Sequence, residues 1–334
     1  MKTAGLVGEA KLRDFLVKFL ERDPKEILGY GDDAIAIKIG GGKVLVAHTN
    51  MLVGSTDIPL GMGWRLVGRK AVVMNVSDIV CKGARPLTIL FSWGVPRGFR
   101  VKAARDVASG LNSAARECGI YVTGGDLGEC EDFVLAGTAF GLAEADRIIG
   151  RSGAAPGDLL AATGSFGLTG VGFKILLERF KTSGLVRRKA LNSVYRPRVR
   201  QREALAVAGV GAATAGMDCS DGLAASLHWL SRMSGVGFII HHIPIPREVK
   251  RFSLSYRLDP IDLALYEGGE EYELIFCITP RKWADAVKAV SRVGGALHKI
   301  GVAMKRKRIV LEIPGRAGEV VKDRGWQHFR KWGK

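Results

Sequence analysis

The sequence predicts a mixed α/β (α+β) protein of two domains, and three observations carry this prediction. The chain has 334 residues, which exceeds the usual size of one domain. Strand-like alternation of apolar residues and helix-like apolar spacing succeed one another along both halves. A Gly- and Pro-rich loop, "GRSGAAPG", follows residue 149, and the boundary near residues 146–151 suits a linker. We therefore expect an N-terminal domain with a mixed sheet over residues 1–146 and a C-terminal α/β domain over residues 147–334.

The first half alternates helical and strand patterns. Ile35, Ile37 and Ile39 alternate with other residues and indicate a strand after a turn. Gly83 and Pro86 end the long apolar helix that begins near residue 64. In chain order we expect a helix over 8–21, strands near 34–39 and 43–53, a helix within 64–86, a strand over 87–96, a helix over 100–117, and strands over 120–126 and 132–143.

The second half repeats this kind of alternation without a close sequence repeat. In chain order we expect a strand within 158–164, helices over 168–180 and 199–215, a helix from about 223, strands near 236–245 and 271–278, a helix over 281–293 and a terminal hairpin.

Composition limits the possible classes of protein. The net charge of +17 permits binding of nucleic acid or of a polyanionic small molecule. Nucleic acid is the less favoured partner, because no RNA-binding or helix-turn-helix motif is present and a basic surface without a motif is usually solvated. No apolar stretch reaches about 18 residues, so we expect no membrane span. Five scattered cysteines without a CxxC pair, and no signal-peptide pattern, favour a reducing cytoplasm.

The stretch "MDCSDGLAASLHWL", residues 217–230, places two aspartates before a helical apolar run. One interpretation is a helix cap, in which Ser220 or Asp221 accepts hydrogen bonds from free backbone N–H groups. Capping needs only one such side chain, however, and Asp218 adds a second carboxylate. The alternative interpretation is a cation site at this helix start.

The helix within residues 64–86 raises a similar question. Asn75 and Asp78 share one face of a helix that is otherwise apolar nearly all round. A buried aspartate is costly unless it is paired or binds a cation. Asp78 therefore either pairs with Lys82, four residues on, or takes part in a cation site.

Further aspartates stand at the ends of predicted elements, beside glycine or other small residues. Asp32 and Asp33 follow Gly31, and Asp126 follows two glycines at a strand end. Hard cations such as Mg²⁺ take oxygen ligands from carboxylates, water and substrate phosphate. Together the acids suit a phosphate site with several metal ions, although each Gly-Asp pair alone is a common turn.

Seven stretches, taken in order, resemble the motifs of the thiamine-monophosphate kinase family, within the superfamily of aminoimidazole ribonucleotide synthetase. They are "GDDAIAI", "MNVSDIVCKGARPL", "GGDLGEC", "GRSGAAPGDLLAATGSFG", "MDCSDGLAASL", "GGEEYEL" and "GWQHF". The resemblance implies transfer of the γ-phosphoryl group of ATP to thiamine monophosphate, with Mg²⁺ as cofactor. It also implies a homodimer formed through the N-terminal domain.

The resemblance assigns roles to particular residues. The implied metal ligands are Asp32, Thr49, Asn50, Asp78, Asp126, Asp218 and Asp221. The implied ATP-binding residues are Gly125, Arg151 and Ser220, and the implied substrate-binding residues are Asp57, Glu270 and Trp326.

One departure bears on activity. The family usually has Ser-Thr-Asp where this chain has His48, Thr49 and Asn50, and uncharged Asn50 should hold a metal ion more weakly. A homologue that binds thiamine phosphates with impaired catalysis is therefore an alternative. A synthetase of the purine type, which shares the acids, is another, although it leaves Trp326 without a clear task.

Overall fold

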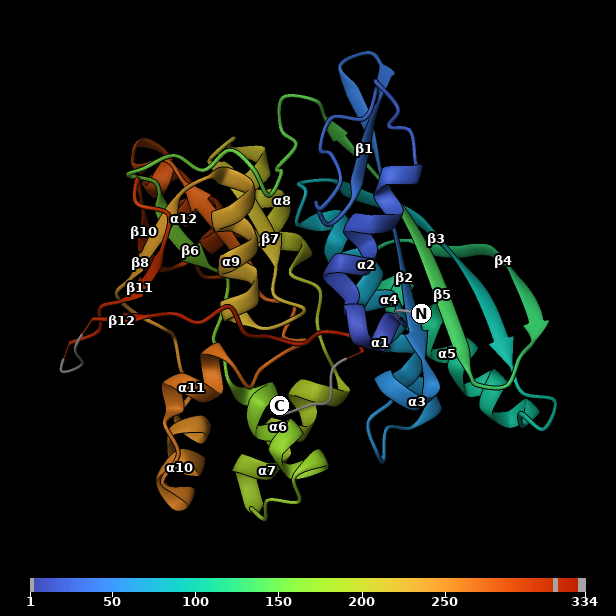
Figure 1. Ribbon diagram of the computed structural model, residues 1–334. Coiled ribbons are helices and arrows are strands. Elements are labelled where there is room, and N and C mark those ends of the chain that lie inside the picture. The colour runs from blue at the N-terminus through green and yellow to red at the C-terminus, as the bar shows by residue number, and fades with distance from the viewer. Residues whose placement is uncertain (1–2, 315–317, 330–334) are drawn as a thin grey trace.

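The computed structural model describes residues 3–314 and 318–329 and shows two β-sheets with helices around them (Figure 1). The strands of the first sheet come from residues 35–144 and those of the second from residues 159–320. The predicted mixed α/β class is confirmed. The domain boundary at residues 146/147 stays a prediction.

The first sheet has the strand order β1-β2-β5-β3-β4. Its neighbours are antiparallel except for β3 and β4, which are parallel. A parallel pair needs a crossover, and α5 (Val101–Glu117) supplies it. The strands are β1 (Ile35–Gly40), β2 (Lys43–Val53), β3 (Arg85–Val95), β4 (Tyr121–Glu129) and β5 (Val134–Glu144).

The two faces of this sheet differ. We call the face toward α4 (Trp64–Val80) the inner face and the opposite face the outer face. On β5 every second residue from Leu135 to Ala143 is buried, and a Cβ on Gly137 would meet the Asn75 side chain of α4. The residues between them, such as Thr138, belong to the outer face and are only partly buried.

The second sheet has the order β12-β11-β8-β10-β6-β9-β7. β9, which lies between β6 and the edge strand β7, is buried along its whole length, as expected for a strand covered on both faces. The strands are β6 (Leu159–Ala162), β7 (Ala213–Asp218), β8 (Gly237–Ile240), β9 (Leu274–Ile278), β10 (His298–Met304), β11 (Ile309–Leu311) and β12 (Glu319–Val320).

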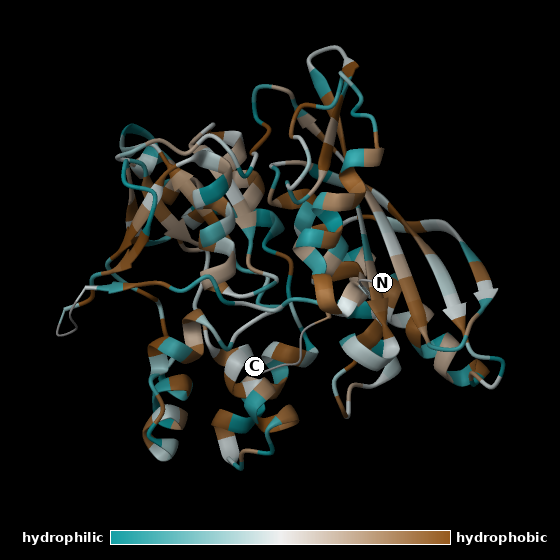
Figure 2. Ribbon diagram, in the orientation of Figure 1, coloured by the Kyte–Doolittle hydropathy of each residue, from teal (hydrophilic) through white to brown (hydrophobic). Residues whose placement is uncertain are grey.

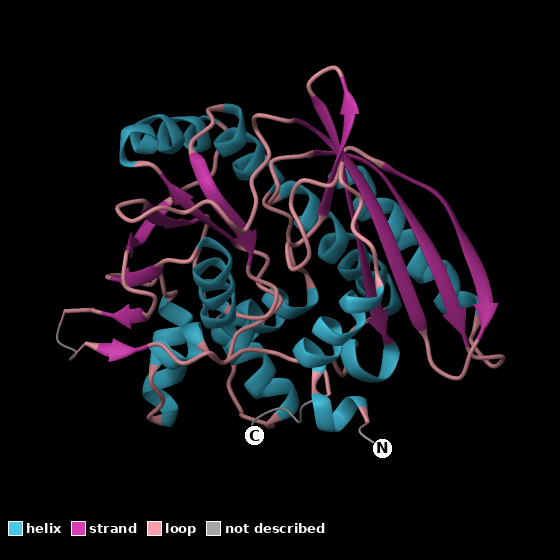
Figure 3. Cartoon of the chain, turned by 45° about the horizontal axis from the view of Figure 1, so that its top comes forward, coloured by secondary structure: helices cyan, strands magenta, loops and turns pink. Residues whose placement is uncertain are grey.

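The remaining helices fall into groups. Four of them pack around a separate small core in the lower part of Figure 1: α6 (Leu168–Leu177), α7 (Gly184–Tyr195), α10 (Arg247–Tyr256) and α11 (Pro260–Leu265). The others are α1 (Ala4–Val7), α2 (Glu9–Leu16), η1 (Val17–Phe19), α3 (Gly54–Asp57), α8 (Gln201–Gly209), α9 (Leu223–Ser234), η2 (Pro280–Lys282) and α12 (Trp283–Arg292). Figure 3 shows the same layers with the fan of long strands at one side.

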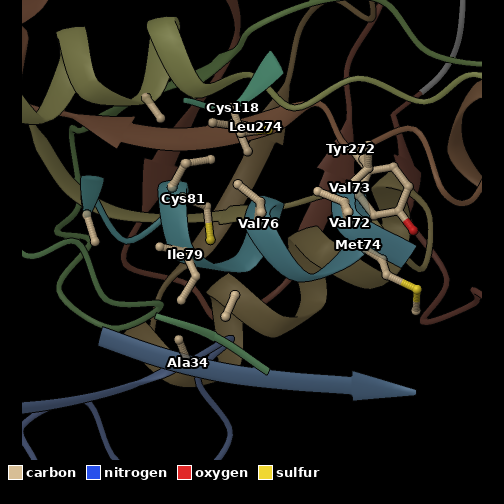
Figure 4. Close-up of a cluster of buried hydrophobic side chains, with 14 of the residues drawn as sticks. Ala34, Val72, Val73, Met74, Val76, Ile79, Cys81, Cys118, Tyr272 and Leu274 are labelled. Carbon is tan, nitrogen blue, oxygen red and sulfur yellow. The ribbon is translucent and has the colours of Figure 1, made fainter. Parts of the chain in front are cut away.

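α4 lies between the two halves and joins their cores. Its apolar side chains pack toward Tyr272 and Leu274 of the second half and toward Ala34 of the first (Figure 4). One continuous hydrophobic cluster therefore includes residues from both sheets. The halves are consequently held by a shared core as well as by the chain that links them.

Three predicted helices differ from the observed ones. The helix expected over 199–215 is wrong at its end, because α8 stops at Gly209 and residues from Ala213 form β7. The helix expected within 64–86 ends at Val80, and the one expected over 8–21 is divided into α2 and η1. α7, α10 and α11 were not predicted; in α7 and α10 clustered basic residues obscure the apolar spacing.

No helix in the described ranges, 3–314 and 318–329, has the length and apolar character needed to cross a membrane. Figure 2 shows hydrophobic residues along the strands of the first sheet rather than in one long helix.

α4 and α5 cross so closely that glycine is required at the contact. A Cβ on Gly110 would lie 1.9 Å from the Arg65 carbonyl oxygen. We predict that Gly110→Ala lowers the free energy of unfolding by about 1–3 kcal/mol, because the helix backbones must separate. Gly98→Ala is the control, since a Cβ there would meet no atom within 4 Å. Thermal unfolding followed by circular dichroism checks this; equal Tm values for the two variants would contradict it.

Candidate functional site

Polar side chains on α4, and in the turn that follows it, define the candidate site. Five of them are buried: Lys70, Asn75, Ser77, Asp78 and Lys82. At 1.5 Å per residue, Lys70 and Lys82 lie about 18 Å apart along the helix axis. Buried polar groups need partners, so the partners of these five show how the site is organised.

At one end, Lys82 is fully buried and its ammonium group meets three oxygens. Nζ lies 2.6 Å from Asp32 Oδ1, 2.5 Å from Asp33 Oδ2 and 3.0 Å from the carbonyl oxygen of Gly216. Arg151 donates from its side chain to Asp33 and from its backbone N–H to Asp32 Oδ2 at 2.8 Å. Both oxygens of Asp32 therefore have partners within the chain.

These groups hold one another in their charged forms. Burial favours neutral Asp33, but Arg151 and Lys82 outweigh it and hold the pKa of that carboxyl well below its usual value. Burial likewise favours neutral Lys82, but Asp33 raises the pKa of Lys82 above its usual value. The interpretation that Lys82 pairs with Asp78 is wrong, because the ammonium group reaches across to the loop before β1 instead.

His48 connects this end to the middle of the site. Its Nδ1 lies 2.5 Å from the Asp33 carbonyl oxygen, and its Nε2 lies 3.1 Å from Asp78 Oδ2. Nε2 makes no hydrogen bond to any residue that the structure describes. Burial lowers the pKa of His48, which favours the neutral imidazole. Cys81 lies within 4.8 Å of the same carboxyls, but burial raises the pKa of its thiol well above the usual value.

In the middle, Asp218 at the end of β7 meets α4. Ser77 Oγ donates to Asp218 Oδ2 at 2.5 Å, while Asp218 Oδ1 is buried without a hydrogen-bond partner. Burial and the neighbouring Asp33 raise the pKa of Asp218 to about 7. Burial and Asp218 raise the pKa of Asp78 well above its usual value.

Asp221 is the third carboxyl in this region whose pKa is raised. Burial and the Glu9 carboxylate raise the pKa of Asp221 to about 7. Unlike Asp33, the acids Asp78, Asp218 and Asp221 have raised pKa values, so the chain supplies too little positive charge near them.

The helix-cap interpretation of this stretch is wrong. α9 begins at Leu223, its N-cap residue is Gly222, and no side chain makes a cap hydrogen bond. Gly222 has a φ of 99°, and a Cβ there would lie 2.6 Å from the Gly268 carbonyl oxygen. The turn therefore needs glycine at its end, and the helix start does not use Ser220 or Asp221 as a cap.

At the other end of α4, Lys70 brings two predicted substrate residues together. Its Nζ lies 2.5 Å from Glu270 Oε1 and donates to the Asp57 carbonyl oxygen at 2.6 Å. Glu270 Oε2 is buried without a hydrogen-bond partner, and Glu270 has a φ of 56°, which is unusual outside glycine. The Glu270 N–H donates to the Ser220 carbonyl oxygen at 2.6 Å.

Trp326 joins this end through its backbone. Its N–H donates to the Asp221 carbonyl oxygen at 3.0 Å, and a Cβ on the preceding Gly325 would lie 2.5 Å from that oxygen. The C-terminal segment therefore passes directly over the turn at 218–222. The structure thus brings together Trp326, Asp221, Ser220 and Glu270 from three distant parts of the sequence.

The remaining predicted residues lie on the first sheet. Asn50 follows His48 on the inner face, and its N–H donates to Asn75 Oδ1 at 3.0 Å. Thr49 lies on the outer face, where its hydroxyl donates to the Gly137 carbonyl oxygen at 2.9 Å.

Asp126 also belongs to the outer face, because it pairs with Ser92 on the exposed edge strand β4. Its neighbour Gly125 faces inward, where a Cβ would lie 1.8 Å from the Phe91 carbonyl oxygen. Asp126 is therefore separated from the carboxyls that meet at α4.

A cavity of about 520 Å³ opens beside the charged end of the site. Asp32, Asp33, His48 and Thr49 line it, together with apolar side chains of β1 and β2. This volume is within the usual range for small-molecule sites. The cavity therefore joins the outer face of the sheet to the charged groups.

Sequence reasoning missed Lys70, Lys82 and His48 as organisers of the site. A signal was available for the lysines: both stand on, or just after, a helix whose other residues are apolar on every side. Such a helix is buried, so its lysines must meet carboxylates or carbonyl groups. The identity of those partners depends on the tertiary fold.

The chain matches two family models that together span most of its length. Residues 31–143 match the N-terminal domain of AIR synthase related proteins, and residues 155–314 match the C-terminal domain.

Three curated relatives of this chain are thiamine-monophosphate kinases. The thiamine-monophosphate kinase of Nitrosopumilus maritimus is 33% identical over 86% of this chain and 89% of its own. The one of Pyrococcus horikoshii is 33% identical over 90% of this chain and 91% of its own. The one of Pyrococcus abyssi is also 33% identical, over 96% of both chains.

Solved structures agree in fold. AaThiL complexed with AMPPCP and TMP has a TM-score of 0.84 at 27% identity and covers 98% of this chain and 99% of its own. A HypE–HypF complex, at 18% identity and a TM-score of 0.75, covers 94% of this chain and 99% of its own and shows the fold alone. With close to a third of its residues shared with curated kinases along nearly its full length, this chain belongs to the thiamine-monophosphate kinase family.

Proposed function

We propose that this protein transfers the γ-phosphoryl group of ATP to thiamine monophosphate and forms thiamine diphosphate and ADP. The observation that carries the proposal is the group of carboxyls formed by buried Asp78 and Asp218 and partly buried Asp221, whose shortage of positive charge suits a metal–phosphate complex. Membership of the family and the likeness to AaThiL, whose complex holds the ATP analogue AMPPCP and TMP, support the same reaction.

The residues present fit Mg²⁺. Asp218 offers a buried oxygen that makes no hydrogen bond, and Asp78 and Asp221 offer hard oxygen ligands near it. When bound there, Mg²⁺ neutralises charge on the two phosphates that must approach each other. We propose Asp78, Asp218 and Asp221 as its ligands.

The nucleotide belongs at the cavity end of the site in this proposal. Arg151 donates to Asp33 and to the Gly31 carbonyl oxygen, at 2.8 Å for the latter, and so fixes the loop that lines the cavity. Fixing this loop holds the phosphate end of ATP against α4. Positioning of this kind is the main contribution that a kinase makes to phosphoryl transfer.

The acceptor belongs at the Lys70 end. Glu270 Oε2 lacks a partner and can accept a hydrogen bond from an amino group such as that of the pyrimidine ring. Trp326 offers an aromatic face to that ring, and Asp57 is held nearby through Lys70. The acceptor phosphate is largely ionised near neutral pH, so its oxygen attacks the γ-phosphorus in line without a general base.

The first test is turnover with ATP, Mg²⁺ and thiamine monophosphate, with ADP release measured by a coupled assay and thiamine diphosphate by fluorescence after oxidation. We expect the two products in equal amounts. Release of ADP without thiamine diphosphate would instead indicate a synthetase of the same superfamily. Binding of both substrates without turnover would indicate the impaired homologue and implicate Asn50.

Asp218→Asn tests, in the same assay, the role of the three carboxyls proposed as metal ligands. We predict a loss of kcat/KM of about 10²-fold or more, because a group that offsets charge in the transition state is lost. Asp285→Asn, an exposed change on α12, is the control and should leave kcat/KM unchanged. Equal activity of the two variants would contradict the proposed metal role.

The same carboxyls predict a pH dependence of stability. Folding raises the pKa of Asp218 and Asp221 from 3.8 to about 7, so the folded state binds more protons between these values. Without divalent cations the free energy of unfolding should therefore fall as pH rises from about 4 to about 7. Mg²⁺ should raise Tm more at about pH 8 than at about pH 5, because it binds the ionised forms. A Tm in chelator that rises across this range would contradict the prediction.

We propose a homodimer formed through the outer face of the first sheet. Ile35, Ile39 and Met51 on that face are each about half exposed, and the edge strand β4 exposes Tyr121 on the same face. Apolar residues exposed together in this way mark an interface, and a second copy of the same face is complementary in chemistry. Such packing would also cover Thr49 and Asp126, the two predicted ligands that lie apart from α4.

Sedimentation tests the dimer. We expect the protein to sediment as two chains of 36.0 kDa each, and Met51→Arg to shift it to one chain by placing a charge in the interface. Leu254→Arg is the control, because Leu254 is 85% exposed on α10 in the other half. Sedimentation of the unchanged protein as a single chain would contradict the dimer.

We also propose the cytoplasm as the place of action. All five cysteines are free, which suits a reducing compartment, and ATP is abundant there.

A further inference from the structure

We propose that the ammonium group of Lys82 serves as a built-in cation at Asp32 and Asp33, so that no divalent metal ion binds Asp32 in this protein. The inference rests on the proposed Mg²⁺ binding and refines it. It narrows the metal site to Asp78, Asp218 and Asp221, and it revises one metal role that the family resemblance implies.

The geometry around Lys82 Nζ is complete. An ammonium group has three protons, and three oxygens receive them: Asp32 Oδ1 at 2.6 Å, Asp33 Oδ2 at 2.5 Å and the Gly216 carbonyl oxygen at 3.0 Å. The side chain is fully buried, so water does not compete for these contacts. No rearrangement is needed for Lys82 to satisfy the two carboxylates.

Both oxygens of Asp32 already accept hydrogen bonds in this arrangement. Oδ1 accepts from Lys82, and Oδ2 accepts the Arg151 N–H at 2.8 Å. Mg²⁺ binds oxygens at about 2.1 Å, so a metal ion on Oδ1 would stand within a few ångströms of the ammonium group. Two cations that close together in a buried site repel each other strongly.

The charges along α4 also separate the Lys82 end from the proposed metal ligands. Lys82 and Arg151 hold the pKa of Asp33 low, whereas the pKa values of Asp78 and Asp218 are raised. Asp218 Oδ1 is also the buried oxygen without a partner. The demand for a further cation therefore lies at Asp218 and not at Asp32. Asn50 carries no negative charge, so it adds no need for a further cation on the inner face of the first sheet.

A purely structural role for Lys82 makes a different prediction. Lys82 also ties α4 to β7 through Gly216, and a tie alone would affect stability without changing the number of bound metal ions. The number of ions bound per chain, and their positions, therefore distinguish the two roles.

The experiment uses Mn²⁺, which replaces Mg²⁺ and is visible by electron paramagnetic resonance. Mn²⁺ titrations compare the unchanged protein with Lys82→Met, which keeps the length of the side chain and removes the charge. We expect Lys82→Met to bind one more Mn²⁺ per chain, and the double change Lys82→Met with Asp32→Asn to lose it again. Equal stoichiometry for the unchanged protein and a folded Lys82→Met would overturn the inference.

Crystals of the unchanged protein with Mn²⁺ and AMPPCP give a second measurement that does not depend on a variant. Anomalous scattering should place Mn²⁺ on Asp78, Asp218 or Asp221 and none within ligand distance of Asp32. A peak on Asp32 with Lys82 displaced would overturn this inference and leave the proposed kinase intact. No peak on any of these aspartates would overturn the proposed metal site, and this inference with it.

Discussion

The free-energy cost of burying charged side chains determines how the parts of this molecule are arranged. α4 and the turn after it lie between the two sheets and are mostly buried, yet they carry Lys70, Asp78 and Lys82. Each of these groups is tolerable only with partners from elsewhere in the chain. Lys70 takes Glu270 and the Asp57 backbone, and Lys82 takes Asp32 and Asp33. The positions of the two halves are thereby fixed relative to one helix.

The carboxyls in the middle of α4 are the exception. Among the described residues, Asp78, Asp218 and Asp221 form no ion pair with a lysine or arginine, and burial raises their pKa values. A fold optimised for stability alone would fill this position with apolar side chains. Retaining three acids there is understandable when the missing charge arrives with a substrate and its metal ion. Raised pKa values in a cluster of carboxyls are typical of a functional site, here one that binds a polyanion through cations.

The sequence predicted which residues are unusual better than it predicted their partners. Asp78 and Asn75 stand out because an apolar helix has no place for them, and the structure brings Asp78 close to Asp218 as a shared role requires. The partner of Lys82 was mistaken, because four-residue spacing is a local rule and the loop at Asp32 comes close only in the folded chain. Thr49 and Asp126 illustrate another limit: their face of the sheet depends on strand pairing, which no local pattern determines.

The C-terminal segment, residues 321–329, is held by other contacts than the buried ion pairs along α4. The Trp326 N–H donates to the Asp221 carbonyl oxygen, and the His328 N–H donates to Glu9 Oε2 at 2.9 Å. Ion pairs of Asp323 with Arg232 and of Arg324 with Glu267 also hold the segment. Glu9 belongs to α2, near the start of the chain, whereas Asp221 belongs to the turn before α9. The C-terminal segment therefore bridges the first helices of the chain and the turn that carries Asp218 and Asp221. The acceptor end is consequently built from segments that come first and last in the sequence.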